Sequence, residues 1–193
     1  MRGADVLVQT LAKAGVTRIF SLSGNQIMPV YDACIETDVR IIHTRHEATT
    51  VFMADAWAQL TGEIGVALVT AAPGFGNAIG PLFTAAASES PVLLLSGDAP
   101  AAKDGLGAFQ ELDQVAISKP LTKLSKRIMS ADAIASETAN AIRLARSGRP
   151  GPVHLALPFD VVQADADSAD TSPGFAAQND ALAPQTGEIA AIR

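Results

Sequence analysis

A carboxylate at the start of a predicted helix is the strongest catalytic candidate in this 193-residue sequence. Glu47 stands in the run TRHEA (44–48), directly after a predicted strand over 39–42 and at the start of a predicted helix over 47–60. A carboxylate can accept or share a proton, so Glu47 is suited to a proton relay. A structural role stays open, because the helix macrodipole favours an acidic group in the first turn.

Two histidines near Glu47 raise the question of a metal site. His43 and His46 straddle the turn from strand to helix, and the remaining histidine, His154, falls in the last predicted strand. No further set of ligands stands beside them in the sequence, so we expect no metal site in this chain.

A glycine-rich turn over 71–77 opens the next predicted helix. Its spacing, Gly74-x-Gly76 and then Gly80, is G-x-G-x-x-x-G. A P-loop ends in Gly-Lys-Ser/Thr and a dinucleotide fingerprint is G-x-G-x-x-G, so neither is present. The glycines allow a backbone to approach a flat ligand closely, or simply tight packing of helix on sheet.

A second glycine-punctuated segment, GLGAFQE (105–111), carries an aromatic ring, an amide and a carboxylate. By itself this pattern is equally typical of a solvent-exposed loop.

The elements that must position these residues alternate between strand and helix. Strands are predicted over 17–20, 39–42, 64–70, 91–96 and 153–157, and helices over 4–14, 26–36, 47–60, 74–87 and 131–146. Such alternation predicts an α/β fold with a parallel sheet, and the continuous apolar strands predict helices on both of its faces. Ligands bind such sheets at the C-terminal strand ends, which points to the turns over 21–25, 43–47 and 71–77.

Bulk properties exclude several classes of function. The formal net charge is −6 and the pI about 4.9, which argues against nucleic-acid binding. The one cysteine, Cys34, fits a reducing compartment. We see no signal peptide and no apolar run long enough to span a membrane, so we expect a cytoplasmic protein.

The composition changes after Gln163. Residues 164–185 are dominated by Ala, Asp, Ser, Pro and Gln, which is typical of a linker. Thr186 then precedes Ile189 and Ile192 at helical spacing. We therefore predict a domain over 1–163, and over 164–193 a linker with the start of a missing domain; a polar tail is the alternative.

Taken in order, these pieces resemble the pyrimidine-binding domain of thiamine-diphosphate enzymes. The resemblance rests on RHE (45–47), TG (61–62), GVALVT (65–70), PG (73–74) with Asn77, SP (90–91) and SG (96–97). The runs AFQE (108–111), KP (119–120) and TK (122–123) are similar to the acetolactate-synthase branch in particular. The runs GPV (151–153) and PFDV (158–161) resemble the closing strand, so the similarity covers residues 3–163.

The resemblance implies roles for individual residues. Glu47 would hydrogen-bond ring nitrogen N1′ of the aminopyrimidine of thiamine diphosphate, which favours the imino tautomer that activates the cofactor. The residues expected to border the cofactor are Gly24, Asn25, Glu47, Pro73, Gly74 and Asn77. On the substrate side, where a small 2-oxo acid would bind, the resemblance places Phe109 and Gln110.

The resemblance also implies a missing half. Family members hold the diphosphate through Mg²⁺ at a Gly-Asp-Gly motif, of which Gly97-Asp98-Ala99 is the nearest approach here. We therefore expect Mg²⁺ only in a missing domain, and as partner the diphosphate-binding domain of the same or a neighbouring subunit. The whole protein would be a homo-dimer or tetramer, and this chain alone would be inactive.

Two turns depart from the family pattern. Gly-Tyr-Pro-Gly-Gly is replaced by SLSGN (21–25), and Thr-Ser-Gly-Pro-Gly by TAAPG (70–74). Besides acetolactate-type decarboxylation or carboligation, another decarboxylase, a lyase or an oxalyl-CoA-decarboxylase-like activity therefore stays open. The competing hypothesis is a non-catalytic, flavodoxin-like α/β interaction module, in which Glu47 would be solvated and not face a cleft.

Overall fold

The computed structural model describes residues 1–167 and contains one six-stranded sheet in which every strand pair is parallel. The strand order is β2-β1-β3-β4-β6-β5. The strands are β1 (Arg18–Ser21), β2 (Arg40–His43), β3 (Gly65–Val69), β4 (Val92–Asp98), β5 (Leu124–Arg127) and β6 (Val153–Pro158).

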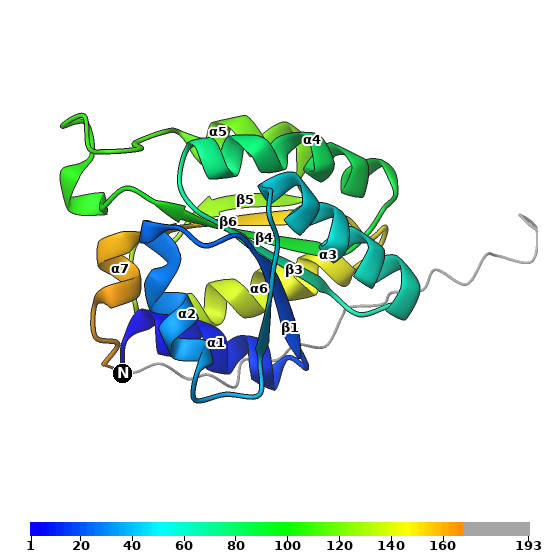
Figure 1. Cartoon of the computed structure of the whole chain (residues 1–193), viewed down its shortest axis with the longest axis horizontal. Coiled ribbons are helices and arrows are strands. Elements are labelled where there is room, and N and C mark those ends of the chain that lie inside the picture. The colour runs from blue at the N-terminus through cyan, green and yellow to red at the C-terminus, as the bar shows by residue number, and fades with distance from the viewer. Residues whose placement is uncertain (168–193) are drawn as a thin grey trace, which may run out of the picture.

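Helices cover both faces of this sheet, as Figure 1 shows. On one face lie α1 (Gly3–Lys13), α2 (Met28–Cys34) and α6 (Ile134–Arg146), and on the other α3 (Glu47–Thr61), α4 (Pro73–Ala87) and α5 (Gln114–Ser118). The short elements are α7 (Phe159–Gln163), η1 (Asn25–Ile27), η2 (Ala101–Lys103) and η3 (Lys119–Leu121). The expected α/β fold with a parallel sheet and helices on both faces is confirmed.

The two faces of β3 explain why this arrangement is stable. All residues of β3 are buried, and side chains alternate between two cores. Val66 and Leu68 pack with α1, α2 and α6, whereas Ala67 and Val69 pack with α3 and α4. Full burial of a side chain such as Leu68 contributes roughly 2 kcal/mol, which anchors the sheet that positions the turns.

Some elements differ from the sequence prediction. The structure adds an edge strand, β5, and a short helix, α5, where the sequence indicated neither. Gln26 belongs to the 3₁₀ turn η1, and α2 begins only at Met28. β4 also runs two residues further than predicted, to Asp98.

The segment after α7 returns to the N-terminus. The Gly3 amide donates to the Ala164 carbonyl at 2.9 Å, and the Ala166 amide donates to the Met1 carbonyl at 2.8 Å. The beginning of the predicted linker is therefore attached to the domain, and its remainder lies outside the described residues.

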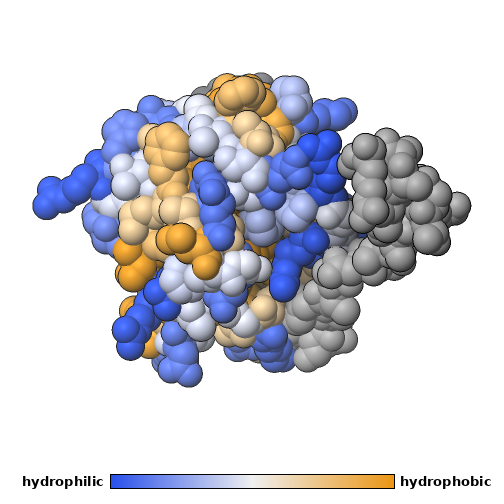
Figure 2. All heavy atoms as spheres, turned by 90° about the vertical axis from the view of Figure 1, so that its right-hand side faces the viewer, coloured by the Kyte–Doolittle hydropathy of each residue, from blue (hydrophilic) through white to orange (hydrophobic). Residues whose placement is uncertain are grey.

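The end of the molecule where the strands begin carries hydrophobic patches separated by hydrophilic residues (Figure 2). Exposed apolar surface is therefore not confined to one functional edge. Within residues 1–167, the helices are all too short or too polar to cross a membrane.

Candidate functional site

The C-terminal ends of the parallel strands bring three turns to one edge of the sheet. β1, β2 and β3 are neighbours, so the turns that follow them are neighbours too. The turn after β2 opens into α3 and the turn after β3 opens into α4. The loop over 99–113, which follows β4, projects at the same edge, at the left of Figure 1.

Glu47 is the first residue of α3 and is partly buried. The preceding residue, His46, caps the helix, since its Nδ1 accepts a hydrogen bond from the Ala48 amide at 3.1 Å. Asn77 of α4 donates from Nδ2 to Glu47 Oε2 at 2.9 Å. Glu47 Oε1 has no hydrogen-bond partner within residues 1–167.

Gly74 packs closely between Thr70 and this free oxygen. A Cβ at Gly74 would lie 3.3 Å from Glu47 Oε1 and 2.7 Å from Thr70 Cγ2. A Cβ at Gly24 would lie only 2.4 Å from Thr70 Cβ. Thr70 therefore packs against both Gly24 and Gly74, and neither position has room for a side chain. Gly74 also lies next to the Glu47 carboxylate.

The chain enters α4 through a strained residue. Ala72 has φ 44° and ψ −95°, a left-handed conformation that L side chains rarely adopt. Pro73 follows at the first helical position, where its missing N–H has no intrahelical partner to lose.

The structure adds a polar side chain that the sequence did not single out. Gln26 is buried, accepts from Thr70 Oγ1 at 2.6 Å and donates to Gln110 Oε1 at 2.8 Å. In the sequence Gln26 looked like an ordinary residue at a helix start. Only the proximity of β1, β3 and the 99–113 loop reveals its position.

The loop that carries Phe109 and Gln110 is held by its own carboxylate. Glu111 accepts from the Gly105 amide at 2.7 Å and from the Ala108 amide at 3.0 Å. These backbone hydrogen bonds lower the pKa of Glu111. Phe109 is 77% exposed, so in this chain its ring is available to another surface or a ligand.

The end of β4 is braced by an ion pair. Asp98 is buried and accepts from Arg127 Nε at 2.6 Å, while Arg127 also binds Asp104. Burial raises the pKa of Asp98, and the nearby Arg127 charge opposes that rise. Asp98 therefore serves the scaffold, and the described part of the chain holds no group of three or more metal-ligand residues.

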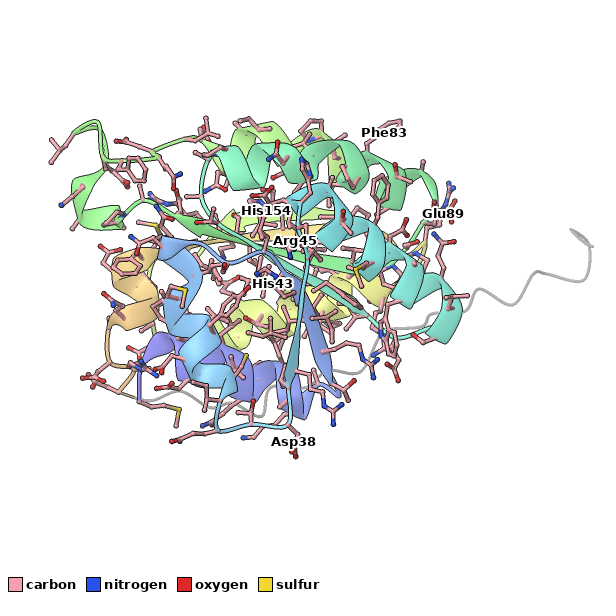
Figure 3. All side chains as sticks on the ribbon, in the orientation of Figure 1. Asp38, His43, Arg45, Phe83, Glu89 and His154 are labelled. Atoms are coloured by element: carbon pink, nitrogen blue, oxygen red, sulfur yellow. The ribbon has the colours of Figure 1, made fainter. Side chains whose placement is uncertain are left out.

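The three histidines do not form one site. His43 is exposed near Arg45 at the end of β2, whereas His154 lies inside the sheet (Figure 3). Burial lowers the pKa of His154 to about 3, so its ring is neutral at pH 7. Serine hydroxyls surround it, with Ser96 at 2.8 Å from Nε2.

The sequence-predicted residues thus fall into two groups. Glu47, Gly74 and Asn77 are in mutual reach, and Gly24 adjoins them through Thr70. Pro73 and Asn25 are exposed at the same edge. Gln110 joins this group through Gln26, whereas Phe109 shows no such link.

These residues fit an aminopyrimidine ring. A free carboxylate oxygen can accept a ring N–H, and Gly74 places no side chain beside that oxygen to compete with a ligand. An α/β domain with a carboxylate and a glycine turn at the C-terminal strand edge has the arrangement expected of a cofactor-binding domain.

Comparison with known proteins specifies the class. The family model described as "Thiamine pyrophosphate enzyme, N-terminal TPP binding domain" matches residues 1–117. The chain belongs to this family, which confirms the resemblance stated from its motifs.

Curated relatives carry two kinds of name. A 2-hydroxyacyl-CoA lyase 2 of Danio rerio is 41% identical over 160 residues, 83% of this chain and 26% of that protein. A catabolic acetolactate synthase of Raoultella terrigena is 39% identical over 182 residues, 94% of this chain and 32% of that protein. A probable acetolactate synthase large subunit of Methanocaldococcus jannaschii is 38% identical over 167 residues, 86% of this chain and 28% of that protein. The chain thus spans about a quarter to a third of the length of these relatives.

Proposed function

We propose that this chain is the half-site that binds the aminopyrimidine of thiamine diphosphate in an enzyme of 2-oxo acid decarboxylation or carboligation. The observation that carries the proposal is the Glu47 carboxylate, which has one oxygen fixed by Asn77 and the other free beside Gly74. Family membership supports thiamine diphosphate as the cofactor.

The residues of this chain orient the cofactor and hold one proton. When bound, thiamine diphosphate supplies a carbanion-stabilising centre for breaking and making bonds to a carbonyl carbon. Glu47 Oε1 accepts or shares the proton at pyrimidine N1′, while Asn77 keeps the carboxylate in one rotamer. Pro73, Gly74, Gly24 and Asn25 would border the cofactor, and Phe109 and Gln110 would face the substrate.

The diphosphate is held elsewhere. No lysine lies between Glu47 and Asn77, and Asp98 is engaged by Arg127. We assign diphosphate and Mg²⁺ binding to a further domain, of the same or a neighbouring subunit. The isolated chain is then inactive, and the cytoplasm is the location expected from the sequence.

A homo-oligomer would bring that domain to the site, with α4 in the interface. Gly76 and Gly80 are exposed on α4, and a Cβ at either position would meet no atom within 4 Å. Nothing within the described chain requires glycine there, although glycine weakens a helix. Phe83, on the outer side of α4 in Figure 3, is 61% exposed. A second surface that approaches α4 closely accounts for both features, in a dimer or tetramer.

A second candidate reaction is cleavage of a 2-hydroxyacyl-CoA. It is favoured by the 41% identity to 2-hydroxyacyl-CoA lyase 2 and by the turn SLSGN, which departs from the synthase pattern. Family membership weighs against the flavodoxin-like interaction module.

Exchange of the C2 proton of bound thiamine diphosphate tests the proposal in the full-length protein. Glu47→Gln keeps the shape of the side chain but cannot take up the proton. We expect exchange to slow at least about a hundredfold, in the range of a lost acid–base catalyst. Glu63→Gln, beyond the far end of α3, is the matched control and should exchange normally. Unchanged exchange in Glu47→Gln would refute the assignment.

Turnover then distinguishes the two reactions. Decarboxylation or carboligation predicts consumption of a small 2-oxo acid such as pyruvate by the full-length protein, whereas the alternative predicts cleavage of a 2-hydroxyacyl-CoA.

A further inference from the structure

A buried glutamine connects the cofactor side of the site with the substrate side. Gln26 is only 5% exposed although it lies in the short 3₁₀ turn η1. Its Oε1 accepts from Thr70, which contacts the Gly74 position, and its Nε2 donates to Gln110 in the loop after β4. One side chain therefore bridges segments that are 44 and 84 residues away in the sequence.

Two glycines make room for this bridge. A Cβ at Gly97 would lie 2.7 Å from Gln26 Cβ, and a Cβ at Gly24 would overlap the Thr70 side chain. Any larger residue at Gly97 would displace Gln26. The position of Gln26 is thus fixed by backbone packing against β4 as well as by its hydrogen bonds.

The bridge also fixes which end of the Gln110 amide is free. Because Gln26 Nε2 donates, Gln110 Oε1 must accept. The Gln110 NH₂ group then has no partner within residues 1–167 and offers two N–H donors. A 2-oxo acid in its ionised form carries only acceptors, in its carboxylate and carbonyl oxygens, so donors are the complementary groups.

The backbone of Gln110 needs such a restraint. Its φ is 62°, in the left-handed region that a non-glycine residue adopts only at a steric cost. Strained residues persist where their surroundings hold them, and they concentrate at functional sites. Glu111 holds the loop backbone, and Gln26 holds the side chain.

We propose that Gln26 is a positioning residue that presents the NH₂ group of Gln110 to the substrate. The inference rests on the proposed function, in which Gln110 faces the substrate. It adds a residue that does not touch the substrate but determines the orientation of one that does.

The first experiment is Gln26→Leu in the full-length protein, with Gln59→Leu as the control. Gln59 also donates an amide hydrogen bond, to Asp55, but lies near the far end of α3. Loss of the two bonds should lower kcat/KM for the 2-oxo acid about tenfold, the usual range for buried neutral hydrogen bonds. The rate of C2 proton exchange should stay within about twofold, because Gln26 shares no hydrogen bond with Glu47 or Asn77.

Hydrogen exchange gives a readout that does not depend on turnover. In Gln26→Leu the amides of Gly105 and Ala108 should exchange faster, because the loop loses its attachment to η1. In Gln59→Leu they should exchange as in the unaltered protein. Unchanged kcat/KM together with unchanged loop exchange in Gln26→Leu would overturn the inference.

Gln26→Glu tests orientation separately and replaces the leucine variant if that one fails to fold. An ionised carboxylate only accepts, so Gln110 must turn its NH₂ group inward and present its oxygen to the substrate. We expect loop exchange to stay slow while kcat/KM falls as the pH rises through the pKa of the introduced carboxyl group. If kcat/KM of Gln26→Glu differs from that of the unaltered protein by the same factor at every pH, the inference is contradicted.

Different results would refute the proposed function and the role of Gln26. Normal C2 exchange in Glu47→Gln would remove the cofactor assignment, whereas a Gln26→Leu protein with unaltered loop and kcat/KM removes only the role of Gln26.

Discussion

Asn77 Nδ2 donates to Glu47 Oε2 at 2.9 Å, joining the first turn of α3 to the second turn of α4. This bond fixes the rotamer of the carboxylate and leaves its other oxygen beside Gly74. Asn77→Ala should therefore slow C2 proton exchange about tenfold in the full-length protein, less than Glu47→Gln, because the carboxylate remains but loses its orientation. Thr84→Ala, exposed on the same helix, should exchange normally. Equal rates for Asn77→Ala and the unaltered protein would show that the bond does not position Glu47.

Ala72 offers a test of the strain at the entrance to α4. Its φ of 44° is accessible to glycine without steric cost. Ala72→Gly should raise the free energy of unfolding by about 0.5–1 kcal/mol, the released strain minus the entropy that glycine adds to the unfolded chain. Ala71→Gly is the control, because Ala71 is fully buried and its backbone is not left-handed. Loss of the Ala71 methyl group should lower the free energy of unfolding by about 1 kcal/mol. Denaturant titration measures the free energy of unfolding of both variants. A lower value for Ala72→Gly than for the unaltered protein would show that the Ala72 backbone is not strained.

The sequence predicted the scaffold better than the site. β3 reads as a continuous apolar run and was predicted to within one residue at each end, because burial on both faces dictates its composition. β5, in contrast, has Leu124 as its only apolar residue and lies at the sheet edge, so its pattern resembles a loop. Burial of Gln26 depends on Gly24 and Gly97, which are distant in the sequence, and no local pattern contains that information.

The exposed glycines of α4 predict opposite effects on folding and association. Gly80→Ala should raise the free energy of unfolding of the monomer by about 1 kcal/mol, since alanine favours the helix and a Cβ there meets no atom. If a second copy packs on α4, the same methyl group should weaken self-association at least about tenfold. Sedimentation of the full-length protein measures association. Ser136 is exposed on α6 at the other face of the sheet, so the control Ser136→Ala should leave self-association unchanged. If Gly80→Ala also leaves self-association unchanged, α4 faces solvent and lies outside the interface.

Cofactor binding to the isolated chain tests the half-site. The described residues offer the pyrimidine a carboxylate and a glycine face, and none of their side-chain groups forms a metal cluster for the diphosphate. Calorimetry of this chain with thiamine diphosphate and Mg²⁺ should therefore show a Kd of about millimolar or weaker, and no turnover of a 2-oxo acid. Micromolar binding would mean that this chain holds the diphosphate as well.

His154 predicts how stability depends on pH. Burial depresses its pKa to about 3 in the folded state, below the value of about 6.5 expected in the unfolded chain. Between these values the unfolded state binds the extra proton, so the free energy of unfolding falls as the pH is lowered. The contribution is fully present above about pH 6.5 and is lost towards pH 3, with a slope of about 1.4 kcal/mol per pH unit.

His154→Gln cannot take up that proton and should flatten the slope between pH 6.5 and 4, even if lost contacts with Ser96 and Ser118 lower stability at pH 7. Denaturant midpoints measured across this range, with the exposed His43→Gln as control, decide the point: a slope that survives in His154→Gln would assign the acid sensitivity to other groups.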